Sequence, residues 1–401
     1  LQVLRHTQHR LLSTGRTVLS QSRQTNESGA GSKSAAALIA ASAAAATLGA
    51  VGFICWRGHQ QWKSKLVRDK KFESVQFVKA EVDQSKAKSD AESSYFCWLP
   101  TDVYRALDGV ASMPVRSGDI FVVSFPKAGT TWLQELVFML ATDFDSKLAE
   151  TVSIEDRFPY LEYPYPGLAT IKRWPMNTSR RFIKSHLPWG LLPRSVVDDK
   201  LSKGSGAKVI YLARCPKDTS ISYYHFLRML SPLIGYTGDW AGDFVDRFLD
   251  SSGDRPLPYG PWLDHVEAFW RVSCDRPDRV MFLTYEELMA DTAGCVIRIA
   301  RFLGVTEPSQ RRVNEIVDFC NFHRMRLRPT TSYSWYRRYG AHDPRMGFYR
   351  AGRAGGWRSL MSADEAARFD AELLEPLRAR CGLRLGEKGE KSAAAADEGP
   401  S

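Results

Sequence analysis

The chain has 401 residues, of which 44% are hydrophobic and 11% aromatic, so it can bury a large core. Its net charge is +10, but it has no zinc-finger spacing, nucleic-acid-binding motif or single dense basic tract, which favours an anionic small molecule over nucleic acid as its partner. Its seven cysteines never form C-x-x-C and its eight histidines do not cluster, which argues against a disulfide framework and a metal site.

The first part of the chain has the composition of a targeting and anchoring sequence. Residues 1–33 are basic and rich in Ser, which is typical of a mitochondrial transit peptide and also of the flank of a signal anchor. Residues 34–56 carry no charge, and as a helix they would extend about 34 Å, enough to cross a bilayer core. We therefore expect a single-pass membrane anchor at 34–56; an Ala-rich buried or disordered stretch is the alternative.

The next segment bears on topology. Basic residues are denser just after residue 56 than before the anchor, which favours a cytosolic placement of the C-terminal domain. Mitochondrial and Golgi placements remain open. We expect 57–94 to be a charged tether, 95–385 to be the folded catalytic domain and 386–401 to be a disordered tail.

Residues 124–132, S-F-P-K-A-G-T-T-W, stand between a short apolar run and a helical pattern. A strand that turns into a helix presents free backbone N–H groups and the positive end of the helix dipole to an anion. Gly129 permits close backbone approach, Lys127 adds a charge, and Thr130 and Thr131 add hydroxyl donors. This pattern predicts a phosphate-binding loop. It differs from the nucleotide-triphosphate loop G-x-x-x-x-G-K-[ST], because its lysine precedes its only glycine.

A candidate general base lies in 181–188, R-F-I-K-S-H-L-P. In an extended segment, alternation places Phe182, Lys184 and His186 on one face. A neutral histidine accepts a proton near physiological pH, and a neighbouring lysine favours the neutral form by repulsion. A purely structural histidine is the alternative.

Further strand-to-helix junctions lie downstream. Arg214 ends the predicted strand 209–213, where ligands bind in open α/β sheets, and Ser222 can add a hydroxyl to its planar fork of donors. A surface ion pair is the alternative for this arginine. The segment 348–358, F-Y-R-A-G-R-A-G-G-W-R, has glycines for close approach and arginines that can close over an anion. Strands alternating with helices predict an α/β fold, with a mainly parallel central sheet flanked by helices on both faces.

Together these motifs resemble the cytosolic sulfotransferases. The strings K-A-G-T-T-W, K-S-H-L-P, R-C-P-K-D-T-S-I-S-Y-Y-H-F, L-T-Y-E-E-L and R-A-G-R-A-G-G-W-R occur in the family's order and spacing, over roughly 95–383. The resemblance implies the sulfotransferase fold with a P-loop-like phosphosulfate-binding loop. It also implies 3′-phosphoadenosine-5′-phosphosulfate (PAPS) as co-substrate, no metal, and transfer of the sulfuryl group to a hydroxyl or amine of a small phenol, alcohol or steroid-like acceptor.

The resemblance also implies residue roles. The catalytic residues would be His186 as general base, Lys127 at the leaving phosphate and Lys184 at the transferring group. Arg214 and Ser222 would hold the 3′-phosphate, and Arg350 and Gly352 would close on it. Trp132, Tyr285 and Phe322 would contact the adenine. The complete cofactor-binding set carried over by match is Lys127, Ala128, Gly129, Thr130, Thr131, Trp132, Arg214, Ser222, Tyr285, Phe322, Arg350 and Gly352.

The chain departs from the family pattern at several positions. Ala128 and Asn321 stand where Ser is usual, Cys215 where Asn is usual, and Ala351 where a Lys would strengthen the 3′-phosphate contact. The dimer motif K-x-x-x-T-V-x-x-x-E is not reproduced at 358–367, so a homodimer is left open. Two other functions also remain open: a membrane-tethered, non-catalytic cofactor-binding protein, and a P-loop kinase or NTPase.

Overall fold

The computed structural model describes residues 77–83, 94–163, 167–175, 180–198, 206–250, 257–333, 343 and 345–386. All of them belong to one compact unit of the chain, Cys55–Ser401. The expected targeting segment, the anchor at 34–56 and the tail beyond Gly386 lie outside the described residues. Within the described ranges, every helix is too short or too polar to span a bilayer.

A parallel sheet of four strands forms the centre, in the order β4-β3-β5-β6. The strands are β3 (Asp119–Ser124), β4 (Arg181–Ser185), β5 (Lys208–Ala213) and β6 (Val280–Thr284). Val122 pairs with Lys184 and with Ile210, so β3 lies between its two neighbours and their carboxyl ends share one edge of the sheet. Every residue of β3 is buried, as expected for a strand covered on both faces. This topology confirms the predicted α/β class.

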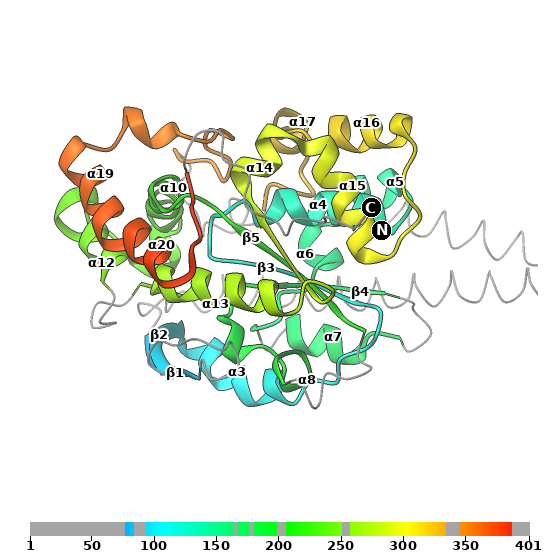
Figure 1. Ribbon diagram of the computed structural model, residues 1–401, viewed down its shortest axis with the longest axis horizontal. Helices are drawn as coiled ribbons and strands as arrows, with labels where there is room; N and C mark the ends of the chain where they lie inside the picture. Colours follow the sequence, from blue (N-terminus) through cyan, green and yellow to red (C-terminus); the bar gives the residue numbers. More distant parts are fainter. Residues whose placement is uncertain are drawn as a thin grey trace, which may run out of the picture. The chain divides into compact units, whose positions relative to one another are not determined.

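Two layers of helices cover the sheet, because successive side chains of each strand point to opposite faces. Ile120 and Val122 enter one core cluster, whereas Phe121 and Val123 enter the other. The first layer includes α4 (Thr130–Ala141), α15 (Thr292–Leu303) and α16 (Gln310–Phe319). The second includes α3 (Thr101–Ala111), α7 (Ala169–Arg173) and α8 (Arg194–Val197). Figure 1 shows these two sets on opposite sides of the strands.

The long helix α13 (Trp262–Asp275) also packs in the core of the second layer, and the other helices complete the fold. These others are α5 (Ser146–Thr151), α6 (Ile154–Arg157), α10 (Pro216–Met229), α11 (Ser231–Ile234), α12 (Val245–Leu249), α14 (Tyr285–Ala290), α17 (Phe322–Leu327), α19 (Ala363–Phe369) and α20 (Glu375–Cys381). Single turns of other helix types are η3 (Trp189–Leu191), η4 (Trp240–Phe244), η5 (Gly356–Ser359) and η6 (Asp370–Leu374).

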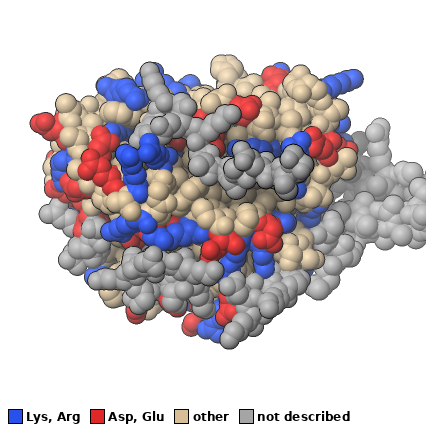
Figure 2. Space-filling view, in the orientation of Figure 1, with Lys and Arg blue, Asp and Glu red and all other residues tan. Residues whose placement is uncertain are grey.

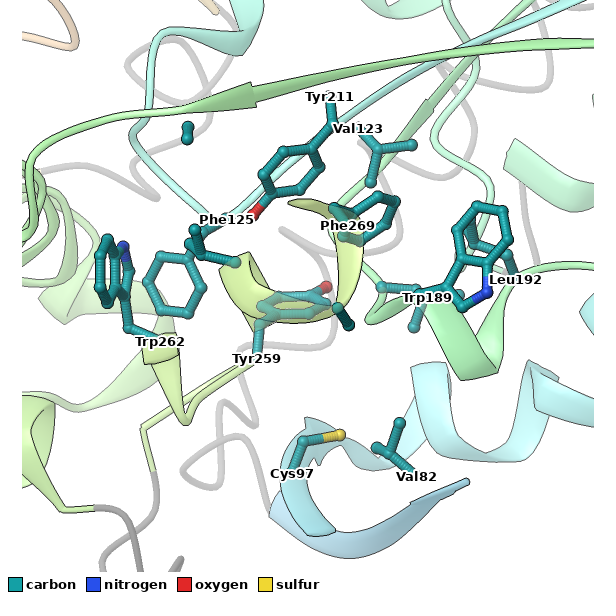
Figure 3. Packing of buried hydrophobic residues seen from close by; sticks show 14 of the residues in the cluster. Val82, Cys97, Val123, Phe125, Trp189, Leu192, Tyr211, Tyr259, Trp262 and Phe269 are labelled. Carbon is teal, nitrogen blue, oxygen red and sulfur yellow. The ribbon is translucent and has the colours of Figure 1, made fainter. Parts of the chain in front are cut away.

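The expected start of the folded domain at residue 95 is too late. Part of the predicted tether forms β1 (Phe77–Asp83), which pairs antiparallel with β2 (Ser94–Pro100). Val82 and Cys97 from this pair are buried in the same core as Trp189 (Figure 3). The prediction failed because few side chains of β1 reach the core, and the surrounding charged residues conceal the alternation.

Lys and Arg are interleaved with Asp and Glu on the face shown in Figure 2, so the charges there do not form one continuous basic field. Lys127, Lys184, Arg214 and Arg350 instead lie close enough together, at the carboxyl edge of the sheet, to repel one another.

Candidate active site

The carboxyl edge of the sheet brings together residues from all four strand ends. Lys127 follows β3, His186 follows β4, Arg214 follows β5 and Tyr285 follows β6. Each was predicted from a separate motif. Ligands of open α/β proteins bind at this edge, outside the carboxyl ends of the strands. The motifs therefore converge on one candidate site.

The loop after β3 turns sharply before α4. Lys127 and Gly129 both have positive φ angles, 71° and 108°, and Gly129 is the residue that precedes the helix. A side chain at Gly129 would come within 2.7 Å of the Tyr285 ring, so only glycine fits between the loop and that ring. The buried Ala128 donates its N–H to the Phe125 carbonyl, at 3.3 Å. The loop thus forms the compact turn predicted for an anion-binding helix start.

Both threonines of the loop are buried and have protein partners. The hydroxyl oxygens of Thr130 and Ser124 lie 2.6 Å apart, and Thr131 hydrogen-bonds to Tyr333. These contacts fix the orientation of the first turn of α4. Donation from these hydroxyls to a ligand stays a prediction.

The ammonium of Lys127 is surrounded by other cations and by aromatic rings. Burial lowers its pKa to about 7, and repulsion from Lys184, Arg214 and Arg350 acts in the same direction. Its Nζ lies over the rings of Phe226 and Phe348, at 4.3 and 4.2 Å from their centroids. Mutual repulsion of this kind is relieved by an anion, so the cluster fits a highly charged anionic ligand.

Arg214 connects the loops at this edge. Its Nη1 donates to the Lys127 carbonyl at 3.4 Å, and its Nη2 donates to the Arg353 carbonyl at 3.0 Å. The guanidinium also stacks on Tyr285, at 4.2 Å. Because Arg214 is only 7% exposed and pairs with carbonyls, the alternative of a surface ion pair is wrong. Ser222, predicted to act with it, is half-buried in the second turn of α10.

Three buried donors at this edge have no hydrogen-bond partner. Buried polar atoms without a hydrogen-bond partner also occur elsewhere in the described residues, for example Nε1 of Trp189 and Nε1 of Trp240, but three lie at this edge: the Nε atoms of Arg214 and Arg350 and Nε1 of Trp132. Such orphaned donors are rare in folded proteins and usually indicate an absent ligand or water. Two belong to cations and one to an indole, which matches a ligand that combines phosphate groups with an aromatic base.

Aromatic residues from distant segments flank these donors. The rings of Trp132 and Tyr285 meet edge to face, with centroids 5.6 Å apart. Phe322, at the start of α17, packs directly on Gly352 and lies edge to face with Tyr349 at 5.7 Å. The predicted members of an adenine pocket therefore form two separate aromatic contacts.

The ring of His186 is held in one tautomer. Its Nδ1 lies 2.7 Å from the Ser124 carbonyl oxygen, which only accepts hydrogen bonds. In the neutral ring the proton must therefore sit on Nδ1, leaving the Nε2 lone pair available. Burial, followed by repulsion from Lys184, lowers the pKa of His186 well below its usual value, so the ring is neutral at physiological pH. The predicted influence of Lys184 is present, but burial is the larger cause.

The backbone of His186 is fixed from two sides. Its N–H donates to Oε1 of Glu162 at 2.7 Å, and its carbonyl lies 3.0 Å from Nε2 of the buried His265. The Tyr160 and Tyr259 rings stand edge to face with the imidazole, at 5.3 and 5.8 Å. These contacts fix the position of the imidazole beside the end of β3.

Lys184 and His186 contact the same ring, in agreement with the predicted alternation. Nζ of Lys184 lies 4.2 Å from the Tyr160 centroid and 3.4 Å from the Tyr333 hydroxyl. Burial lowers the pKa of this lysine to about 8, and Glu162 partly opposes that effect. Lys184 therefore retains most of its charge near neutral pH, beside an uncharged His186.

Several neighbours of the site were not assigned from the sequence, notably Glu162, Tyr333 and Asp218. Glu162 is an acidic residue inside an aromatic run, which was an available signal for a buried, functional carboxyl. Tyr333 has no comparable signal, because its contact with Lys184 spans 149 positions. Asp218 has no distinguishing signal either, because an acidic residue in the first turn of a helix is common, although this one is completely buried.

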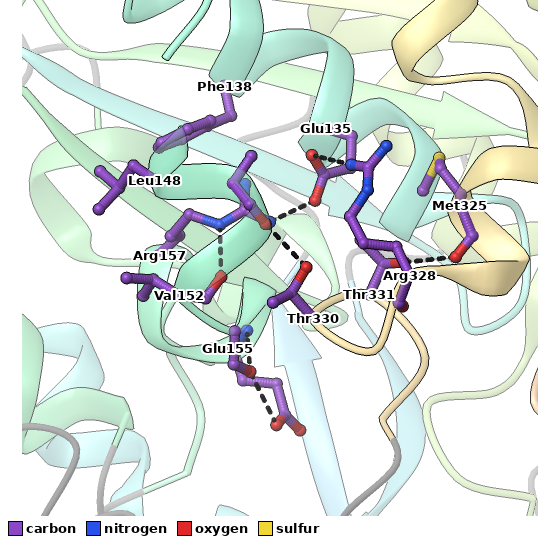
Figure 4. A network of polar contacts seen from close by, with 12 residues as sticks. Glu135, Phe138, Leu148, Val152, Glu155, Arg157, Met325, Arg328, Thr330 and Thr331 are labelled. Carbon is purple, nitrogen blue, oxygen red and sulfur yellow. Dashed lines mark hydrogen bonds and ion pairs between the residues drawn. The ribbon is translucent and has the colours of Figure 1, made fainter. Parts of the chain in front are cut away.

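A buried polar network connects α4, the helix that follows the loop, to neighbouring segments (Figure 4). Glu135 of α4 pairs with Arg157 at the end of α6, and its other oxygen lies 3.5 Å from Nη1 of Arg328. All three side chains are largely buried. The network ties α4 to the segment that carries Tyr333, so the loop and its neighbours are held as one unit.

Comparison with known proteins identifies the family of this chain. A family model described as a sulfotransferase domain matches residues 117–378. Human sulfotransferase 4A1 is 36% identical over 253 residues, which are 61% of this chain and 83% of the relative. Sulfotransferase 1A1 from Bos taurus is 31% identical over 281 residues, which are 70% and 90% of the two chains.

Solved structures give the same answer for the fold. Mouse sulfotransferase SULT7A1 in complex with PAP has a TM-score of 0.51 at 26% identity, covering 69% of this chain and 90% of its own. Retinol dehydratase in complex with retinol and PAP has a TM-score of 0.65 at 24% identity, covering 80% and 96%, and it supports the fold alone.

A parallel sheet with a sharp strand-to-helix loop, buried cations and a neutral imidazole at one edge suits an enzyme that transfers a group from an anionic donor. The matches are specific about the class: the chain belongs to the sulfotransferase family.

Proposed function

We propose that this chain moves the sulfuryl group of PAPS in line to a hydroxyl or amine of a small acceptor, with His186 as general base. Membership of the family makes PAPS the co-substrate. One observation carries the proposed role of His186: its Nδ1 is held by the Ser124 carbonyl, so the free Nε2 of a neutral ring can take the acceptor's proton.

The remaining residues would bind and neutralise charge. The loop 127–132 offers the N-terminus of α4 to the phosphosulfate, and Lys127 is suited to the negative charge that develops on the leaving phosphate. Arg214 and Arg350 have the orphaned donors that suit the 3′-phosphate. By analogy with phosphoryl transfer, positioning and charge stabilisation account for most of the catalysis, and the acceptor proton passes to His186.

The acceptor class follows from the rings beside the base. Tyr160 and Tyr259 flank the imidazole edge to face, and their hydroxyl groups lie 3.3 Å apart. Aromatic walls of this kind suit a flat, largely apolar molecule with one hydroxyl. We therefore propose phenols, steroid alcohols and related alcohols as acceptors.

The decisive assay uses the purified chain, radiolabelled PAPS and a panel of phenols, steroid alcohols and amines. Labelled product from at least one acceptor is expected. Binding of PAP, the inactive form of the cofactor, without transfer to any acceptor would instead favour a non-catalytic cofactor-binding protein. Magnesium-dependent turnover of ATP would favour a P-loop kinase.

Cofactor binding is expected to take up protons near neutral pH. The pKa of Lys127 is about 7 in the free protein, and a phosphate placed beside it must raise that value. PAP affinity should therefore be highest below about pH 7 and fall as the pH rises toward about 9, where the free lysine is neutral. Calorimetry in buffers of different ionisation enthalpy measures the uptake. Equal affinity across this range would contradict the prediction.

Gly352→Ala is expected to weaken PAP binding, in addition to the folding stability that it loses through backbone strain. Gly352 has φ of +60°, and an added Cβ would lie 2.3 Å from the Phe322 ring. Gly304→Ala is the matched control, because Gly304 has the same φ and nothing within 4 Å of an added Cβ. Both variants should lose about 1–2 kcal/mol of stability from the positive φ, with a further loss in Gly352→Ala from the clash with Phe322, as measured by thermal unfolding; only Gly352→Ala should lose affinity in calorimetry. Equal PAP affinity in the two variants would contradict this prediction.

We also propose that residues 34–56 anchor the enzyme in a membrane with the catalytic domain on the cytosolic side. The uncharged composition of that segment and the basic residues after it support this proposal. Alkaline extraction of membranes should leave the full chain in the pellet and release a variant lacking 1–56. Protease protection of the catalytic domain in intact organelles would instead support a Golgi lumenal or mitochondrial placement.

A further inference from the structure

Asp218 holds a distant part of the chain against the cofactor edge. It lies in the first turn of α10 and is 0% exposed. Its Oδ2 accepts the N–H of Gly355 at 2.6 Å, and its Oδ1 accepts the N–H of Trp357 at 3.0 Å. Both amides belong to the segment 350–357, which we call the closing segment.

An acidic residue in the first turn of a helix would ordinarily be explained by that helix. Its charge stabilises the positive end of the dipole, or its oxygen caps the free amides there. Both oxygens of Asp218 are instead engaged by amides 137 and 139 positions further along the chain. These two hydrogen bonds therefore do not cap or otherwise stabilise the start of α10. Their effect must be sought in the closing segment.

The closing segment contains cations that repel one another. Burial, followed by repulsion from Arg214, lowers the pKa of Arg350, and Arg353 acts in the same direction. Asp218 opposes these effects on Arg350. A buried carboxylate that both accepts backbone N–H groups and lies among these guanidinium groups can hold them at one edge when no ligand neutralises them.

Neighbouring residues reinforce the same attachment. Nη2 of Arg214 donates to the Arg353 carbonyl at 3.0 Å, and Nζ of Lys217 lies 4.3 Å from the Trp357 centroid. Lys217 also pairs with Asp370 at 2.6 Å. Three residues at the junction between β5 and α10 therefore hold the closing segment at successive positions: Arg214, Lys217 and Asp218.

We propose that Asp218 is a positioning residue that pre-organises the closing segment for the 3′-phosphate of the cofactor. This inference rests on the proposed function. A segment fastened before binding does not lose its conformational entropy at the binding step, so its arginines meet the phosphate at lower cost. The contacts of Asp218 are with the closing segment and not with His186, so it acts on cofactor affinity rather than on the chemical step.

Asp218→Asn tests the inference, because the amide group offers one acceptor oxygen where the carboxylate offers two. We expect PAP to bind at least about tenfold more weakly by calorimetry, equivalent to about 1.4 kcal/mol. The KM for PAPS should rise by a similar factor, whereas kcat at saturating PAPS and the acceptor KM should stay within about twofold. Asp364→Asn, at an exposed acid in the first turn of α19, is the matched control and should match the wild type.

A second variant approaches the same contact from the other side and leaves the buried charge in place. In Gly356→Ala, the added Cβ would lie 3.2 Å from Nε of Arg353 and 3.5 Å from Oδ1 of Asp218. We expect a smaller loss of PAP affinity, about threefold. Hydrogen exchange should also show faster exchange at the Gly355 and Trp357 amides in both variants.

The outcomes separate the two proposals. If the wild type binds PAP and both variants bind it equally well, the inference for Asp218 is overturned and the proposed function stands. An equal fall in kcat with no change in the KM for PAPS would also overturn the inference. If the wild type does not bind PAP, the proposed function itself fails. If Asp218→Asn does not fold, Gly356→Ala decides.

Discussion

Replacing His186 by alanine is expected to lower kcat by about 10²- to 10⁴-fold, the range for removal of a general base. The reason is that the neutral ring has its proton on Nδ1, against the Ser124 carbonyl, and its Nε2 is the proton acceptor. PAP affinity should change little, because the imidazole contributes no charge to the cofactor cations. Steady-state kinetics at saturating PAPS, together with PAP calorimetry, measures both quantities.

The matched control for this variant is His323→Ala, because His323 is exposed on α17. It should retain wild-type kcat. If His186→Ala kept a kcat within about threefold of the wild type with normal folding, general-base catalysis by this residue would be excluded, and a non-catalytic role for the protein would gain support.

Replacing Lys127 by methionine is expected to lower kcat by about 10²- to 10³-fold, comparable to the loss of one donor to a developing negative charge. Methionine keeps most of the side-chain length and still packs between Phe226 and Phe348, so the loop should remain folded. PAP affinity should fall as well, and the proton uptake on binding should be largely lost, because Lys127 is the group whose pKa is lowered to about 7.

Single-turnover kinetics with pre-bound PAPS would isolate the chemical step in Lys127→Met from the weaker binding. Lys147→Met, at an exposed lysine of α5, is the control and should behave as the wild type. Unchanged single-turnover rates in Lys127→Met would show that the charge of this lysine serves binding alone.

Local patterns predicted the separate parts of this site because each motif is a strand followed directly by a turn. The glycine before α4, the proline that begins α10 and the threonine that caps α14 mark the points where strands give way to helices. Such junctions place Lys127, Arg214 and Tyr285 at carboxyl ends of strands. In a parallel sheet those ends lie on one edge, so the existence of a shared site could be argued before any fold was known.

The same reasoning failed where the signal was weak or long-range. β1 was assigned to a tether, because its apolar face is short and its neighbours are charged. The role of Asp218 was missed, because the amides that donate to it lie 137 and 139 positions further along the chain. Arg214 was given a surface ion pair as its alternative, because burial of a polar side chain cannot be read from its immediate neighbours.

By itself, the sequence determined the local units around the site: the junctions where strands give way to helices, the turn that favours an anion, and the histidine and lysine that share a face. Periodicity and turn chemistry depend on residues that are near neighbours in the chain, so they can be recognised from the sequence. Only the tertiary structure decided the strand order, the neutral tautomer of His186 and the fastening of the closing segment by Asp218. Those features depend on contacts between residues far apart in the sequence, and burial then sets the charge states that the chemistry requires.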